Sequence, residues 1–257
     1  MRPRIDTARL AGLAGLALAL CWPLSPAWAS AESAFVKSLD RPVATKTVRP
    51  KSDADAVGQI ACTYYADLMI RESGTDSPDP NDATLVPLAK GAQRPPCGTV
   101  GLTGAIALKT EGYALQGRKG GFLIWDVSDP NGAEPFMVMD ARTGRVLFED
   151  GMSPSLGLRR TAALQDGVLR LKYTRGVNAP CSMAQDAQSC WSKLVAAGGA
   201  PKTMPALTRA PASCLAAYGH TPKDDPSVIT YTLDMTLDTS GKATILSTGA
   251  VTCQPQP

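Results

Sequence analysis

Apolar and polar residues alternate along much of this chain, which is the pattern of β-strands that bury one face. The alternation is regular from Gln59 to Arg71 and predicts one long half-buried strand there, with Cys62 on the core side. It is equally regular over residues 227–237, where five apolar side chains alternate with Thr and Asp: Ile229, Tyr231, Leu233, Met235 and Leu237. The turn DTSG follows and predicts a return strand towards Cys253.

Turn residues join other alternating segments into hairpins. Residues 112–127 contain a Gly-rich turn, and residues 163–173 contain Asp166-Gly167, a pair suited to the left-handed turn that matches strand twist. Residues 136–150, FMVMDARTGRVLFED, predict two strands around a turn at Asp140–Gly144. The short segment 84–88 predicts a strand that its proline, at position 87, confines to a sheet edge.

The turn in residues 136–150 carries Asp140, Ala141, Thr143 and Gly144. The segment VMDARTGRVLFED resembles the hairpins of quinoprotein-type propeller blades, which have an Asp-Ala-x-Thr-Gly turn, and those of PepSY-type modules, which have Asp-x-x-Thr-Gly. A propeller implies several blades at a fixed period, and the one echo here is LDTSGKATI at 237–245. Because Asp and Thr bond turn backbone while Gly takes a positive φ, turn chemistry alone accounts for the similarity, and no family is assigned.

The core candidates of this hairpin are four apolar side chains, namely Phe136, Val138, Val146 and Phe148. Helix signals are confined to the part of the chain after Pro180. There an apolar stripe of Trp191, Leu194 and Val195 precedes a Gly198-Gly199 stop, and a second short helix is predicted over Pro211–Tyr218 with Gly219 as its cap.

The first residues predict a secretory signal peptide over 1–29. Three arginines precede an apolar run at Leu10–Leu20, and small residues stand at positions −3 and −1 to a cut after Ala29. The apolar run is shorter than the ~20 residues that cross a bilayer, so we expect no membrane span in the mature chain. Residues 30–56 show no sustained period and predict an extended, mobile lead-in.

An even number of cysteines in an exported chain predicts disulfides, and the mature part has six: Cys62, Cys97, Cys181, Cys190, Cys214 and Cys253. Six allow fifteen connectivities, of which we favour the near-sequential one, 62–97, 181–190 and 214–253. A helix starting at Ser182 would place Cys181 and Cys190 about 12 Å apart, beyond the ~7 Å limit for Cα atoms of a disulfide. A 181–190 bond therefore predicts a helix that starts near Asp186–Ser189.

These patterns predict a mainly antiparallel β protein, sandwich-like or another meander of hairpins, with one or two short helices in the C-terminal third. An α+β arrangement of two subdomains is the alternative. A β domain at 57–151 and a disulfide-containing α+β part at 156–257 are the expected units, which can also form one domain.

Net charge and residue usage limit the classes of function that we expect for this chain. Removing residues 1–29 takes away three arginines and one aspartate, so the formal net charge of +3 falls to about +1 and gives no electrostatic basis for nucleic-acid binding. Cysteine spacing shows no zinc motif and His220 is the sole histidine, so we expect no metal, no cofactor and no histidine-based catalysis. No catalytic residue is assigned.

Four residues are candidates for a surface site. Glu149 and Asp150 close the second strand of the 136–150 hairpin, where function often lies. Arg170 and Lys172 share one strand face, joined by Arg159 or Arg160, and such a basic face can hold an anionic ligand. The resulting expectation is a periplasmic or secreted, non-catalytic protein that binds a protein, an envelope component or a small ligand. A carboxylate-dependent hydrolase and an inhibitor of an exported enzyme are the alternatives.

Overall fold

The structure is a computed structural model that describes residues 38–49, 58–74, 82–99, 101–110, 112–127, 132–153 and 161–256. It is mainly antiparallel β with two sheets, and the described residues contain two short helices, both late in the chain. The predicted fold class is therefore confirmed. The expected signal peptide, Arg159 and Arg160 lie outside the described residues. None of the helices described is long and apolar enough to cross a bilayer.

The smaller sheet is a five-stranded meander in which each strand pairs with the next along the chain. Its strands are β1 (Ala44–Val48), β2 (Ile60–Tyr64), β3 (Leu68–Ser73), β4 (Asp82–Pro87) and β5 (Ile106–Leu108). β1 belongs to the segment predicted as a mobile lead-in. That part of the prediction is wrong, because β1 pairs over its whole length with β2.

The larger sheet has nine strands and follows the order β13-β12-β11-β9-β8-β7-β6, with β10 paired to β11 and β14 paired to β12. The strands are β6 (Ala114–Lys119), β7 (Phe122–Asp126), β8 (Glu134–Asp140), β9 (Val146–Met152), β10 (Thr161–Gln165), β11 (Val168–Ala179), β12 (Ser227–Leu237), β13 (Ala243–Thr248) and β14 (Thr252–Pro255). All of its pairings are antiparallel.

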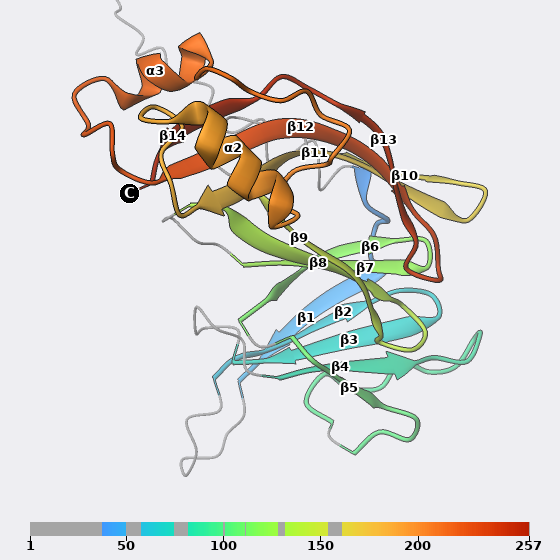
Figure 1. The fold of residues 1–257 in the computed structure, drawn as a ribbon. Coiled ribbons are helices and arrows are strands. Elements are labelled where there is room, and N and C mark those ends of the chain that lie inside the picture. The colour runs from blue at the N-terminus through green and yellow to red at the C-terminus, as the bar shows by residue number, and fades with distance from the viewer. Residues whose placement is uncertain are drawn as a thin grey trace, which may run out of the picture.

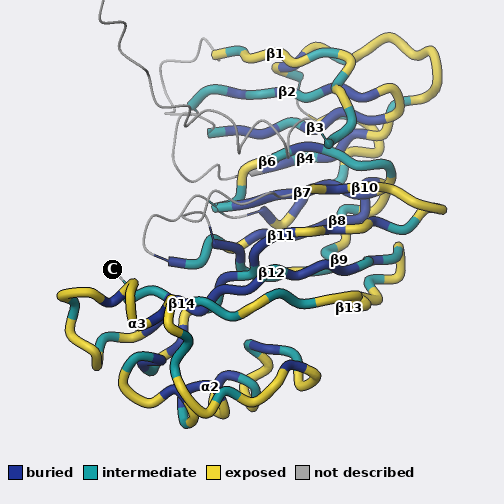
Figure 2. Tube along the Cα trace, turned by 90° about the horizontal axis from the view of Figure 1, so that it is seen from above, coloured by how far each residue is buried: buried dark blue, intermediate teal, exposed yellow. Residues whose placement is uncertain are grey.

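The larger sheet folds back on itself, so that the molecule has three β layers (Figure 1). Strands β6–β9 form the middle layer, strands β10–β13 form an upper layer over one face of it, and the smaller sheet covers the other face. Successive side chains of β8 show this placement: Phe136 and Val138 belong to the core under β11 and β12, whereas Met137 and Met139 belong to the core against the smaller sheet. The two central strands of this layer, β7 and β8, are consequently buried on both faces (Figure 2).

Four predicted hairpins are present, namely β6–β7, β8–β9, β10–β11 and β12–β13. At the β10–β11 turn, Asp166 and Gly167 have φ of 50° and 78°, the left-handed geometry expected of this pair. Of the hairpin core candidates, Phe136 and Val138 are fully buried, but Val146 and Phe148 are only half-buried. A bulge places Leu147 in the core between them.

The single long strand predicted at residues 59–71 is wrong, because the chain turns back at Tyr65–Leu68 to make β2 and β3. The turn exchanges the two faces, so that Cys62 faces a small outer core while Ile70 faces the middle layer. Two apolar residues interrupt the alternation in sequence, Tyr65 and Met69, and both are buried on the faces that this turn creates.

The edge position predicted for residues 84–88 is also wrong, since β4 lies between β3 and β5. The strand tolerates Pro87 because β5 pairs only with Ala83, Thr84 and Leu85. The missing N–H of the proline therefore leaves no hydrogen bond of the sheet unmade.

The three disulfides have the favoured connectivity, with Cα atoms 5.6 Å apart in 62–97, 5.6 Å in 181–190 and 4.7 Å in 214–253. Helix α2 (Ala187–Ala196) starts after Asp186, whose carboxylate accepts the Ser189 N–H at 3.0 Å. The late start of this helix is thus confirmed. Helix α3 (Ala212–Tyr218) ends at Gly219, as predicted.

The division expected at residues 152–155 falls inside the larger sheet, where Met152 of β9 pairs with Arg175 of β11. The two sheets themselves divide the chain earlier, between β5 and β6. Their faces share one apolar cluster. Whether the chain forms one folding domain or two stays a prediction.

Candidate functional site

The two carboxylates singled out on β9 point to opposite sides of the strand, as neighbouring residues of a strand do. Glu149 is exposed, whereas the side chain of Asp150 is only 7% exposed, so its prediction as a surface residue is wrong. The structure therefore does not bring these two groups together as a pair of acid and base.

Asp150 belongs to a buried polar network. Arg175 donates from Nε to Asp150 Oδ1 at 2.7 Å, and the Tyr173 hydroxyl donates to Oδ2 of the same carboxylate. Arg175 also donates from Nη1 to the Tyr231 hydroxyl at 2.8 Å and to the Gly199 carbonyl at 3.2 Å. The network links the middle layer, β11, β12 and the chain just after α2.

Burial and neighbouring charges shift the pKa values of the two tyrosines and the arginine of this network. Burial, reinforced by the charge of Asp150, raises the pKa of Tyr173 well above its usual range, so this phenol stays protonated. Burial also raises the pKa of Tyr231, although Arg175 opposes the change. Burial opposes the charge of Arg175, but Asp150 and Tyr231 together more than compensate, so the pKa of Arg175 is raised. We interpret this network of Asp150, Tyr173, Arg175 and Tyr231, which we call the brace, as a structural link between the layers.

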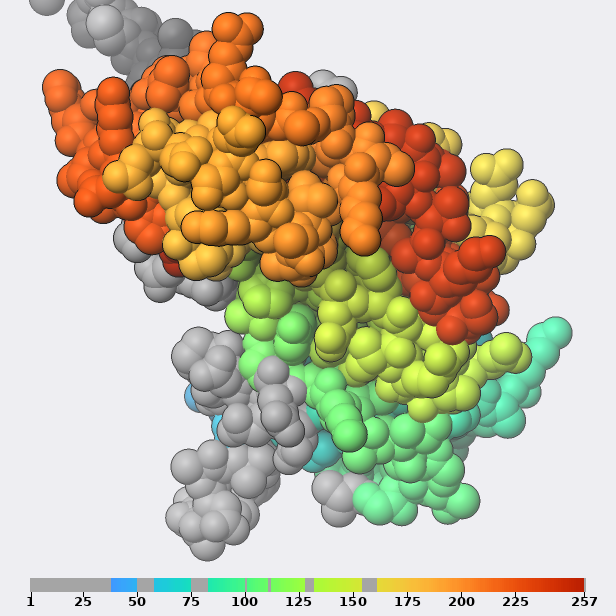
Figure 3. All heavy atoms as spheres, viewed as in Figure 1, coloured from blue at the N-terminus to red at the C-terminus, as the bar shows by residue number. Residues whose placement is uncertain are grey.

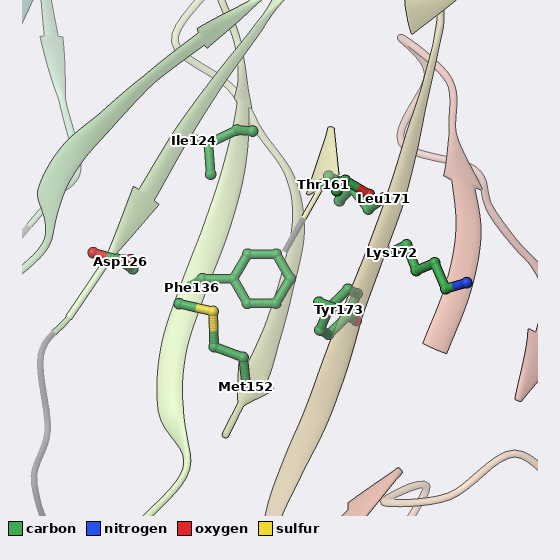
Figure 4. A pocket seen from close by; sticks show the side chains of 8 residues that line it. All are labelled: Ile124, Asp126, Phe136, Met152, Thr161, Leu171, Lys172 and Tyr173. Carbon is green, nitrogen blue, oxygen red and sulfur yellow. The ribbon is translucent and has the colours of Figure 1, made fainter. Parts of the chain in front are cut away.

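A cavity of about 20 Å³ lies between the middle layer and the strands over it, next to the brace (Figure 4). Phe136 and Tyr173 form its wall, with ring centroids 4.9 Å apart in an edge-to-face contact. A cavity of this size has room for about one water molecule. It is a packing gap of the core and does not offer space for a ligand.

Arg170 and Lys172 do lie together on an exposed face, but β12 adds an acid to it. Arg170 donates from Nε and Nη2 to the two oxygens of Asp234, at 2.9 and 2.7 Å, and Lys172 is the register partner of Asp234. The pKa of Asp234 is lowered, first by the hydrogen bonds from Arg170. The predicted basic face is thus partly neutralised, which the sequence of β11 alone does not show.

The two similar turns of the sequence lie side by side, because Arg145 donates from Nη2 to the carbonyls of Thr239 and Ser240 at 3.2 and 3.4 Å. In each turn the leading aspartate, Asp140 or Asp238, accepts backbone N–H groups of its own turn. Burial favours protonation of Asp140, but these amides outweigh it and hold its pKa below the usual range. The motif is structural in both places.

A surface that the sequence predictions missed is formed by residues 187–223, which we call the cap. The cap comprises α2, α3, the segment between them and residues 219–223, and it covers one end of the upper layer (Figure 1; orange in Figure 3). These 37 residues contain no Asp or Glu but four cations, all exposed: Lys193, Lys202, Arg209 and Lys223. The absence of acidic residues from this segment can be seen in the sequence, where Asp186 and Asp224 flank it.

An open groove of about 580 Å³ runs between residues 206–212 and α3. Most of the residues that line it are apolar, but Thr208 and Arg209 also line it, and its surface is a mixture of apolar and polar atoms. The side chain of Leu215, on the α3 wall, is 48% exposed. Two disulfides hold this region, one at the start of α2 and one between α3 and β14. A concave surface that combines apolar side chains with polar groups can serve as a binding site.

No group of three or more His, Cys, Asp or Glu side chains that could hold a metal ion occurs among the described residues. His220 is exposed, beyond the end of α3. No family model matches the chain, and neither a curated protein nor a solved structure is similar enough to match it.

Proposed function

We propose that this chain is an exported, non-catalytic binding protein of the cell envelope whose cap groove holds an acidic, partly apolar segment of a protein partner. The observation that carries the proposal is the coincidence of a groove lined mainly by apolar residues with four exposed cations on one disulfide-held cap. Three disulfides also support an oxidising compartment such as the periplasm or the cell exterior.

The chemistry of the groove selects the partner class. Its apolar lining favours aliphatic side chains, and burying the exposed half of Leu215 contributes roughly 1 kcal/mol. Arg209 within the lining and Lys202 in the same loop attract carboxylates, each pair contributing about 0.2–1 kcal/mol at an exposed site. The two disulfides limit the conformations that the cap can adopt, which reduces the conformational entropy lost on association.

The test uses the mature protein and two labelled peptides, Gly-Glu-Leu-Ser-Glu-Leu-Gly and the same sequence with glutamine in place of glutamate. Fluorescence anisotropy at low salt should show binding of the acidic peptide only, and the binding should weaken as salt screens the charges. Reversing both loop cations, by Lys202→Glu with Arg209→Glu, should weaken it about tenfold, which corresponds to about 1.4 kcal/mol.

The matched control reverses two exposed lysines in the loops that follow β4 and β5, by Lys90→Glu with Lys109→Glu, and changes the net charge equally. Equal loss of binding in both double variants would contradict a site on the cap. Separately, turnover of a glycan or peptide library that disappears with Glu149→Gln would contradict the non-catalytic part of the proposal and favour the hydrolase alternative.

A further inference from the structure

The larger sheet does not close where its two edges approach each other. β6 ends the strand order, β10 pairs only with β11, and the two strands are in contact across the gap between the middle and upper layers. Residues 38–40 lie across this gap, before β1. They contact both edges, so they occupy the position that an additional strand or a peptide would take.

Asp40 is held by both its backbone and its side chain. Its N–H donates to the Arg118 carbonyl at 2.8 Å, in a single antiparallel β-bridge with β6. Its Oδ2 accepts the Gly120 N–H at 2.6 Å, and its Oδ1 lies 3.5 Å from the Lys119 ammonium. The β6–β7 turn therefore provides a carboxylate-binding position.

The two preceding residues contact the other parts of the gap. The Ala162 N–H of β10 donates to Ser38 Oγ at 3.1 Å. Leu39 packs against the core between the layers, directly over Gly117, where a Cβ would lie 2.8 Å from Leu39 Cδ1. Gly117 has φ of +148° and no side chain, so the site fits an aliphatic side chain at this position.

We propose that the edges of β6 and β10 form a peptide-binding slot, that Ser38–Asp40 fills it as an intramolecular ligand, and that it accepts a separate peptide with the same hydroxyl–aliphatic–carboxylate order when this segment is displaced. Backbone bonding to a sheet edge combined with a pocket for one side chain is how sheets bind extended peptides. An open groove continues past Ser38 along Gly120, Ala163 and the exposed Leu164, which leaves space for a longer peptide.

The tethered segment competes with any added peptide, since a short flexible connection gives an effective concentration in the millimolar range. The unmodified protein should therefore bind an added peptide weakly. Weakening the tethered segment by Leu39→Asp, which places a carboxylate against apolar side chains, should strengthen binding of an added peptide at least tenfold. This expectation is independent of the cap, which shares no residue with the slot.

The experiment uses the full mature chain, with and without Leu39→Asp, and the labelled peptide Lys-Ser-Leu-Asp-Arg-Pro-Val, which is the sequence of residues 37–43. Anisotropy should show the variant binding at least tenfold more tightly than the unmodified chain. A control peptide with aspartate in place of its leucine should not bind. Equal binding of both peptides to the variant, or equal affinity of both chains for the first peptide, would overturn the proposal.

Amide hydrogen exchange gives a second measurement that does not depend on the affinity. The amides of Ala162 and Gly120 donate to the tethered segment in the structure. In the Leu39→Asp chain they should exchange at least tenfold faster, and a saturating amount of the first peptide should restore their protection. If the variant is too unstable to measure, Asp40→Asn serves instead, with the same expected direction at Gly120. Unchanged exchange of both amides in either variant would contradict the slot.

Discussion

The brace around Asp150 and Arg175 gives the sharpest test of how the layers are held together. Replacing Asp150 with asparagine removes one charge with almost no change of shape. Arg175 then keeps the Tyr231 hydroxyl and the Gly199 carbonyl as acceptors but loses its carboxylate. The side chain of Asp150 is buried, at 7% exposed, and that of Arg175 is partly buried, at 19% exposed, so water cannot fully replace the lost partner.

The expected loss of stability follows from this geometry. Opposite charges 2.7 Å apart attract by roughly 6 kcal/mol at an effective dielectric constant of about 20, and desolvation of both groups offsets much of that energy. Removing one partner of a buried pair typically lowers the free energy of unfolding by about 3–5 kcal/mol. Because Arg175 retains two acceptors, we expect the lower end, about 3 kcal/mol.

The matched control is Asp234→Asn on β12, which breaks a second Asp–Arg pair whose arginine also lies on β11. Its partner Arg170 is 50% exposed, so solvent screens the pair and the expected loss is below about 1 kcal/mol. Urea unfolding of the disulfide-intact protein, followed by tryptophan fluorescence, measures both variants. Losses of similar size, both below about 1 kcal/mol, would refute the assignment of the brace.

A double variant tests the cause of the loss. Adding Arg175→Met to Asp150→Asn removes the unpaired charge and should recover part of the lost free energy of unfolding, because an apolar side chain of similar length suits a buried site better than an unpaired cation. A double variant less stable than Asp150→Asn alone would mean that the remaining hydrogen bonds of Arg175, and not its charge, dominate.

Three further outcomes are expected from the same unfolding assay. Replacing both Cys214 and Cys253 with serine should destabilise the protein by about 4 kcal/mol, the loop entropy for a separation of 39 residues; a loss below about 1 kcal/mol would contradict it. The pKa of Asp140 is lower in the folded protein, so its contribution to the free energy of unfolding is complete above the unfolded pKa near 3.8 and is lost as pH falls through the folded pKa. Asp140→Asn should therefore make the free energy of unfolding depend less on pH in that range, and an unchanged dependence would contradict this role of Asp140. Gly144→Ala should lower the free energy of unfolding by about 1–3 kcal/mol, because φ is +67° and the new Cβ would clash with the side chain of Leu108 on β5. Gly98→Ala should be nearly neutral, because the nearest atom to its new Cβ is 3.9 Å away.

The strands and hairpins could be predicted because their signals are local. Alternation and turn residues such as Asp166-Gly167 specify a hairpin within about a dozen residues. The turn between β2 and β3 has no such signal, since its central residues are Ala66 and Asp67. It is fixed instead by distant contacts: Asp67 pairs with Arg118, and its carbonyl accepts the Leu88 N–H at 2.8 Å.

The roles of the candidate residues depend on how the layers stack, and a single sequence does not contain that information. Asp150 and Glu149 are equivalent in sequence, yet the fold buries one against Arg175 and exposes the other. The sequence predicts that Arg170 is part of a cationic face, but in the fold β12 places Asp234 beside it. The start of α2 was more predictable, because a bond between Cys181 and Cys190 requires the helix to begin late.

The brace also bears on the proposed function, because it ends at the cap. Arg175 bonds the carbonyl of Gly199, directly after α2, and the bond between Cys214 and Cys253 ties α3 to β14. The cap is thus attached to the sheet at both ends of the segment that carries Lys202 and Arg209. If the groove binds by a pre-ordered surface, Asp150→Asn should weaken binding of the acidic peptide only to the extent that the cap loosens, although the variant leaves every groove residue unchanged. An affinity unchanged in a variant that has lost about 3 kcal/mol of stability would mean that the disulfides alone order the groove.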